Sequence, residues 1–73
     1  MKDQRVIDHN NKVNAYRDNF LNELPGMTIN FKQWIDYNTG IAPLIREGAD
    51  LVHKLHEEGL TDYKINMQSG VII

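Results

Sequence analysis

The chain has 73 residues, no cysteine and a formal net charge of −2, from eight Lys and Arg against ten Asp and Glu. A chain of this length builds a single hydrophobic core, which excludes an enzyme with separate cofactor and substrate domains. The lack of cysteine excludes thiol catalysis, disulfide scaffolds and cysteine-based zinc sites. With 41% hydrophobic and 25% charged residues, the sequence predicts one small globular domain over residues 1–73.

The first predicted element is an amphipathic helix over residues 5–24. Its apolar side chains recur at intervals of three, four or seven, which is the spacing of one helix face: Val6, Val13, Tyr16, Phe20 and Leu24. His9 shares this face, where we expect partial burial and a ring nitrogen bonded to a backbone or carboxylate group. Pro25 and Gly26 are predicted to end the helix, because proline cannot continue the hydrogen-bond ladder.

A short second helix is predicted to begin at Thr28 or Asn30, since either side chain can cap a first turn. It is predicted to stop at the turn-forming residues 38–40. Its apolar side is rich in aromatic residues and consists of Phe31, Trp34, Ile35 and Tyr37.

A third helix is predicted from Ile41 or Pro43 to Glu58, because proline is tolerated in a first helical turn. Gly48 lies on the apolar face of this helix, where its cost in helix propensity predicts a close crossing with another helix. Gly59 is the expected C-terminal capping residue.

The last segment is predicted to be a short β-strand or hairpin. Tyr63, Ile65 and Met67 alternate with polar residues in the two-residue rhythm of a half-buried strand. Residues 68–70 form a turn signal, and residues 71–73 strongly favour strand. The sequence therefore predicts a mainly α fold: a three-helix domain with a short C-terminal β-strand or hairpin.

This tail is also the predicted partner surface, because an isolated hairpin is marginally stable and the extended segment of a partner can pair with its edge. Charge is distributed unevenly, with a net +1 over residues 1–18 and a net −3 over residues 44–63, which favours steering towards a charged partner. The predicted partner-binding residues are the tail residues Tyr63, Ile65, Met67, Val71 and Ile72 and the basic residues Arg5 and Lys12. The alternative is that Ile65, Val71 and Ile72 only close the helical core.

Residue types that carry chemistry do not combine into a reactive site. His53, His56 and Glu57 have a spacing that can reach one metal ion on a helix. The residue order that supplies a general base is missing, however, and no Asp or Glu from a distant part of the sequence is evident as a further ligand. A solvated last helical turn explains them better. Asp8, His9 and Ser69 supply the residue types of a nucleophilic triad without a supporting spacing. We predict no catalytic residue, metal, cofactor or small-molecule substrate.

A DNA-binding role is the alternative function. Three helices followed by a strand-turn-strand tail can trace a winged helix-turn-helix, with the third helix as the reading helix. That helix has more acidic than basic residues, so the phosphate backbone would repel it. We therefore predict no specific DNA binding by the domain on its own.

No run of residues is long and apolar enough to span a bilayer, and the N-terminal residues lack the apolar block of a secretory signal. We expect a cytoplasmic protein without a membrane partner.

The chain as a whole, which opens with MKDQRVIDHN and closes with QSGVII, resembles the small early proteins with which lytic bacteriophages take over host machinery. More specifically, it is similar to the short RNA polymerase-binding proteins of Xanthomonas phage. This resemblance implies a non-enzymatic regulator that acts in the host cytoplasm. Such a protein binds the largest subunits of bacterial RNA polymerase, inhibits initiation at host promoters and promotes antitermination. Phage inhibitors of nucleases or of defence systems share the same general character.

Overall fold

Helix α1, Gln4–Asn22, forms where the apolar spacing predicted a helix. In the computed structural model, which describes residues 3–23 and 29–73, it begins after Asp3. The Asp3 carboxylate accepts a hydrogen bond from the backbone N–H of Arg5 and so caps the first turn. Glu23 is the C-cap residue. Leu24 and the expected terminators Pro25 and Gly26 lie outside the described residues.

Helix α2, Phe31–Glu57, is one continuous helix of 27 residues. The prediction of separate second and third helices is therefore wrong. Asn30 caps the N-terminus through a capping box. The Asn30 side chain accepts from the backbone N–H of Gln33, and the Gln33 side chain accepts from the backbone N–H of Asn30. Of the two expected caps, Asn30 is confirmed, and Thr28 lies outside the described residues.

The residues expected to separate these two helices bond within α2 instead. The Asn38 side-chain amide donates to the Trp34 carbonyl oxygen, and the Thr39 hydroxyl donates to the Ile35 carbonyl oxygen, each at 2.8 Å. Bonds to the carbonyl four residues back are the arrangement in which such side chains remain inside a helix. The same residue types that form turns therefore continue this helix.

Packing against α1 explains why Gly40 lies within α2. A Cβ at Gly40 would overlap the hydroxyl of Tyr16, and that hydroxyl donates to the Tyr37 carbonyl oxygen at 3.1 Å. Gly40 thus allows α1 to approach and does not end the helix. Pro43, expected in a first turn, lies well inside α2, where it removes one backbone hydrogen bond.

The predicted C-terminal cap of α2 is confirmed. Gly59 has a φ of 90°, in the left-handed region that favours glycine. Its N–H donates to the His56 carbonyl at 3.0 Å, and the Leu60 N–H donates to the Leu55 carbonyl at 2.9 Å. These two bonds form a Schellman motif, which satisfies carbonyls at the end of the helix.

The C-terminal residues form no strand in the part of the chain that the structure describes, so the predicted β element is wrong. Ile65 and Ile72 make only an isolated antiparallel bridge. On one side of the bridge, Lys64 and Ile73 exchange two backbone hydrogen bonds of 2.7 and 3.2 Å, and on the other side the Asn66 N–H donates to the Val71 carbonyl at 2.9 Å. A side chain of α1 takes the outer edge of this bridge, because the Asn10 amide accepts from the Ile72 N–H at 2.8 Å and donates to its carbonyl at 2.9 Å.

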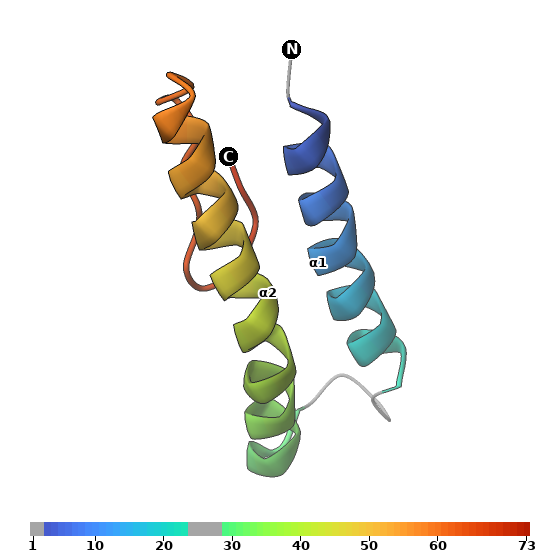
Figure 1. The fold of residues 1–73 in the computed structure, drawn as a ribbon. Coiled ribbons are helices and arrows are strands. Elements are labelled where there is room, and N and C mark those ends of the chain that lie inside the picture. Colours follow the sequence, from blue (N-terminus) through green and yellow to red (C-terminus); the bar gives the residue numbers. More distant parts are fainter. Residues whose placement is uncertain (1–2, 24–28) are drawn as a thin grey trace.

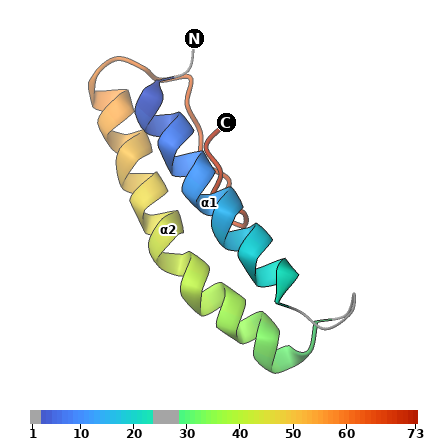
Figure 2. The ribbon, with the colours of Figure 1, turned by 90° about the vertical axis from the view of Figure 1, so that its right-hand side faces the viewer.

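This tail, residues 60–73, lies along the seam between the two antiparallel helices (Figures 1 and 2). Ile72 is fully buried in the main core cluster with Val6, Val52 and Leu55, and Ile65 packs against that cluster. The tail therefore closes the core over only one half of the helical hairpin.

Two residues singled out by the sequence lie at this contact. His9 is 3% exposed, and its Nε2–H donates to the Gly70 carbonyl at 2.7 Å, which confirms the expected backbone partner. A Cβ at Gly48 would lie 2.5 Å from Ile65 Cδ1 and 2.6 Å from His9 Nε2. The expected close approach at Gly48 is confirmed, and it joins α2 to both α1 and the tail.

Candidate functional site

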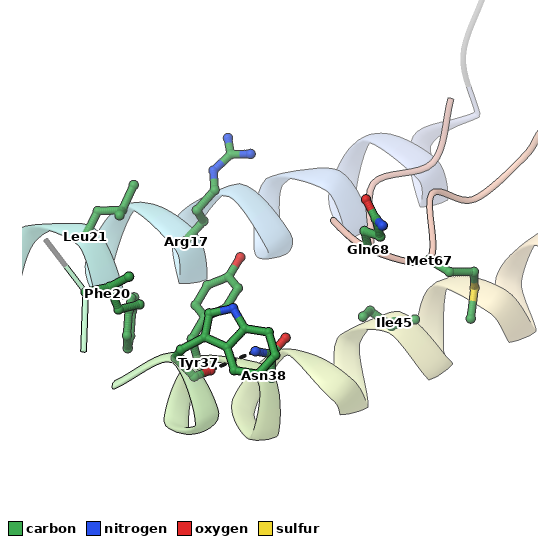
Figure 3. A pocket seen from close by; sticks show the side chains of 10 residues that line it. Arg17, Phe20, Leu21, Tyr37, Asn38, Ile45, Met67 and Gln68 are labelled. Atoms are coloured by element: carbon green, nitrogen blue, oxygen red, sulfur yellow. Dashed lines mark hydrogen bonds between the residues drawn. The ribbon is translucent and has the colours of Figure 1, made fainter. Parts of the chain in front are cut away.

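A groove of about 600 Å³ opens between the two helices where α1 ends and α2 begins (Figure 3). Its lining is mostly apolar and aromatic and comes from both helices, from the residue before Asn30 and from the tail: Arg17, Phe20, Leu21, Ile29, Trp34, Tyr37, Asn38, Ile45, Met67 and Gln68. Clefts of this volume, with apolar walls and a few polar groups, are typical of binding sites.

The groove continues the seam that the tail covers. Met67 and Gln68 lie at the turn of the tail and line the groove on that side. The groove thus adjoins the half of the helical hairpin that the tail covers, and the turn of the tail forms one of its walls.

Large apolar side chains are exposed around this groove. Trp34 is 55% exposed, and Phe31, whose ring stacks on that of Trp34 at 6.5 Å between centroids, is 75% exposed. Since an aromatic side chain buries about 150–250 Å², this pair alone exposes about 200–300 Å². The other exposed apolar residues in this part of the molecule are Leu21, Ile29, Ile35 and Met67. An apolar surface of this extent is characteristic of an interaction site.

The aromatic residues between the helices hold one another in place. The Tyr37 ring lies 5.0 Å from that of Phe20 and 5.5 Å from that of Tyr16, centroid to centroid. Burial, with the nearby Tyr37 and Asp36, raises the pKa of Tyr16 above its ordinary value. The Tyr16 hydroxyl therefore remains protonated at neutral pH and keeps its bond to the Tyr37 carbonyl.

Arg17 is the charged side chain in the groove lining. Its guanidinium donates to Asn14 Oδ1 at 3.1 Å, which leaves the rest of its planar donor set for a ligand. The acidic residues Glu23 and Asp36 line a separate hollow of about 390 Å³. Asp36 lies two residues from Asn38, so the two side chains point about 200° apart around α2. In Figure 3 the Arg17 side chain extends away from Tyr37, so its positive charge lies at the rim of the groove. Among the described residues, no carboxylate belongs to the groove lining.

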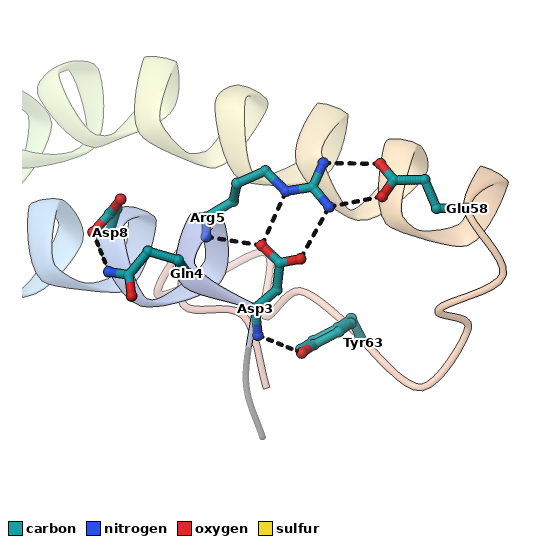
Figure 4. A network of polar contacts seen from close by, with 6 residues as sticks. All are labelled: Asp3, Gln4, Arg5, Asp8, Glu58 and Tyr63. Carbon is teal, nitrogen blue, oxygen red and sulfur yellow. Dashed lines mark hydrogen bonds and ion pairs between the residues drawn. The ribbon is translucent and has the colours of Figure 1, made fainter.

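A network of polar contacts lies at the opposite end of the hairpin (Figure 4). The Arg5 guanidinium bonds both oxygens of Glu58 at 2.8 Å and both oxygens of Asp3 at 2.9 and 3.0 Å. These bonds hold the pKa of each carboxyl below its ordinary value and raise that of Arg5. The Tyr63 hydroxyl accepts from the Asp3 backbone N–H at 2.8 Å. The network fastens the start of α1 to the end of α2 and to the tail.

The structure disperses the predicted partner-binding residues, and of these only Met67 lines the groove. Ile72 is fully buried, Ile65 and Val71 are half-buried, and Tyr63 belongs to the Arg5 network. Lys12 is exposed and pairs with Glu47 at 3.1 Å. The strand edge expected to take up a partner's extended segment is absent from the described residues, and the Asn10 amide already pairs with Ile72.

The sequence reasoning missed Arg17, Leu21 and Trp34 as site residues. The available signal was the second predicted helix, in which aromatic residues are unusually frequent for so short a segment. An apolar helix face usually packs into a core, so this pattern alone does not distinguish a buried face from an exposed one.

Two of the three candidate metal ligands pair with each other, and the third bonds to the tail. His53 Nε2 contacts Glu57 Oε1 at 2.9 Å, and His56 Nε2 donates to the Tyr63 carbonyl oxygen at 2.8 Å. Within residues 3–23 and 29–73, no group of three or more His, Asp or Glu side chains could hold a metal ion. Likewise, Ser69 Oγ accepts from the Val71 N–H at 3.3 Å.

Comparisons with protein-family models, with curated protein sequences and with solved structures give no match to this chain. Neither α1 nor α2 has the length and apolar content needed to cross a membrane.

Proposed function

We propose that this chain is a non-enzymatic regulator that binds a partner protein through the groove between α1 and α2. The observation that supports this function best is the exposure of Trp34 and Phe31 beside an apolar groove. A small domain gains little stability from exposed aromatic rings, whereas a partner that covers them gains a large apolar contact.

Bacterial RNA polymerase is the partner to test first, because the whole chain resembles the phage proteins that bind its largest subunits. Under this proposal the protein acts in the cytoplasm of the host cell. It inhibits initiation at host promoters and promotes antitermination, by contact and without catalytic turnover.

The alternative DNA-binding function loses its structural basis. A winged helix-turn-helix needs a reading helix set against two others and a strand pair for the wing. The described residues form two antiparallel helices and no strand. Protein binding therefore explains the described surface better than DNA binding does.

The experiment is gel filtration of the purified protein with bacterial RNA polymerase, followed by transcription from a promoter and through a terminator. We expect stoichiometric co-migration at micromolar concentration, fewer initiated transcripts and more read-through. The variant Leu21→Glu places a charge on the groove wall at an exposed helical position and should lose binding while it stays folded. The matched control Leu60→Glu makes the same change at an exposed residue outside the groove lining. Absence of co-migration by the parent protein would refute RNA polymerase as the partner.

A further inference from the structure

The two halves of the helical hairpin differ in what covers them. In one half, Ile65 and Ile72 of the tail pack over the seam, and Asn10 of α1 holds the backbone of Ile72. In the other half, the same seam continues as the groove. In the covered half, the covering element is thus a segment with apolar side chains towards the helices and a polar anchor on α1.

Arg17 holds the corresponding anchor position in the uncovered half. It lies seven residues after Asn10, two helical turns further along the same stripe of α1. Asn10 matches a backbone amide, with one donor and one acceptor, whereas Arg17 has only donors and carries a full positive charge. A guanidinium in this place fits a carboxylate, which it can bind through two parallel hydrogen bonds.

The geometry points to the occupant: an amphipathic helix of a partner protein that lays its apolar face in the groove and presents an Asp or Glu side chain to Arg17. This inference rests on the proposed function and adds the chemistry of the partner. From Trp34 to Ile45 the groove follows α2 over 12 residues, a rise of about 16 Å at 1.5 Å per step, which is about three turns of an occupying helix. Such a helix would complete a three-helix arrangement, the usual way in which a helical groove is filled.

Charge argues against a second copy of this chain as the occupant. A copy that faced the groove with its own groove would bring a second Arg17, and no carboxylate belongs to that lining. The acidic residues Glu23 and Asp36 line the other hollow. Two copies would therefore meet with like charges and leave both guanidinium groups unpaired.

The test uses two synthetic helical peptides of about 15 residues, long enough for the three turns described above. Both carry leucines at i, i+3, i+4 and i+7 and contain no aromatic residue. One has glutamates beside the leucine stripe, and its twin has lysines at the same positions. Trp34, the chain's single tryptophan, lines the groove and reports binding through its fluorescence. We expect the glutamate peptide to shift the emission to shorter wavelength and to bind roughly tenfold or more tightly than the lysine peptide.

Charge reversal at Arg17 supplies the decisive variant. Arg17→Glu should invert the preference, so that the lysine peptide binds more tightly than the glutamate peptide. Arg46→Glu is the matched control, because Arg46 is exposed on α2 and does not line the groove. It should leave the preference for the glutamate peptide unchanged.

Several results would overturn the inference. If the two peptides bind equally tightly, or if neither binds, an acidic helix is not the occupant of the groove. A fluorescence shift that depends on protein concentration alone would identify a second copy. Protection of Trp34 from iodide quenching in the free protein would show that the chain covers its own groove.

The two proposals fail separately. Co-migration of RNA polymerase with both the parent protein and Leu21→Glu would refute the groove while retaining the partner. Preference for the glutamate peptide without polymerase binding would support the groove and refute that partner.

Discussion

Asn10 is one of the α1 side chains that hold the tail, together with His9, whose Nε2–H donates to the Gly70 carbonyl. The Asn10 amide forms two hydrogen bonds with the backbone of Ile72, 62 residues away in the sequence. Ile72 is fully buried, so Asn10→Ala would leave a backbone donor and a backbone acceptor with restricted access to water. Leaving such a group without a partner costs about 1–3 kcal/mol. Because these bonds are partly accessible, the lower part of that range applies, and the two groups together cost about 2–3 kcal/mol.

The same substitution also changes helix propensity in the opposite direction. Alanine is favoured over asparagine inside a helix by about 0.6 kcal/mol, so the net loss for Asn10→Ala is about 1.5–2.5 kcal/mol. A domain of this size has about 3–5 kcal/mol of stability in total. The loss should therefore lower the melting temperature by about 10 °C.

Asn11→Ala is the matched control, because Asn11 is exposed at the next position of the same helix. Asn11→Ala has the same favourable change in helix propensity as Asn10→Ala but leaves the contact between α1 and the tail intact. Urea unfolding followed by circular dichroism gives the two free energies of unfolding, and amide hydrogen exchange at Ile72 reports the local bond. If Asn10→Ala and Asn11→Ala unfold within about 0.5 kcal/mol of each other, the reasoning on the tail contact is wrong.

Three further perturbations test the packing, the ion pairs and the helix cap. Gly48→Ala should lower the free energy of unfolding in urea by about 1–3 kcal/mol, because its Cβ would lie 2.5 Å from Ile65 Cδ1; unchanged stability would contradict the close approach. Arg5→Gln should flatten the dependence of the urea midpoint on pH: the lowered carboxyl pKa values stabilise the parent above the ordinary 4.5 and 3.8, and that stability is lost as the pH falls through and below them. Parallel pH profiles for the two proteins would refute this. Gly59→Ala should cost about 1 kcal/mol in thermal unfolding, because φ is 90° there, and an unaltered melting temperature would count against the left-handed cap.

Local signals in the sequence predicted the elements whose residues act on their immediate neighbours. The spacing of Val6 and Val13 placed α1 almost at its observed bounds, Asn30 was a correct candidate for the N-cap of α2, and Gly59 was identified as its C-terminal glycine. A cap or a helix face involves residues within one or two turns. Such features can therefore be predicted without knowledge of the rest of the fold.

The helix end predicted at residues 38–40 is wrong because the residue types found there are compatible with two structures. Asn38 and Thr39 can terminate a helix or bond to carbonyls four residues back inside it. The second state is present here, where the contact of Gly40 with Tyr16 of α1 requires the helical path. That choice depends on a residue more than 20 positions away.

The tail shows the same limit for β structure and for the site. Alternation at Tyr63, Ile65 and Met67 predicted a strand, and that prediction is wrong. Ile65 and Ile72 form a single bridge, and the Asn10 amide of α1 bonds to the N–H and carbonyl of Ile72 on the edge that faces away from Ile65. The sequence by itself determined the helical faces, the caps and the aromatic residues available for a site. Only the tertiary structure decided which of those residues stay exposed, since burial of Trp34 depends on how far along the seam the tail reaches. Burial is a property of contacts between distant segments, and no local pattern of residues encodes it.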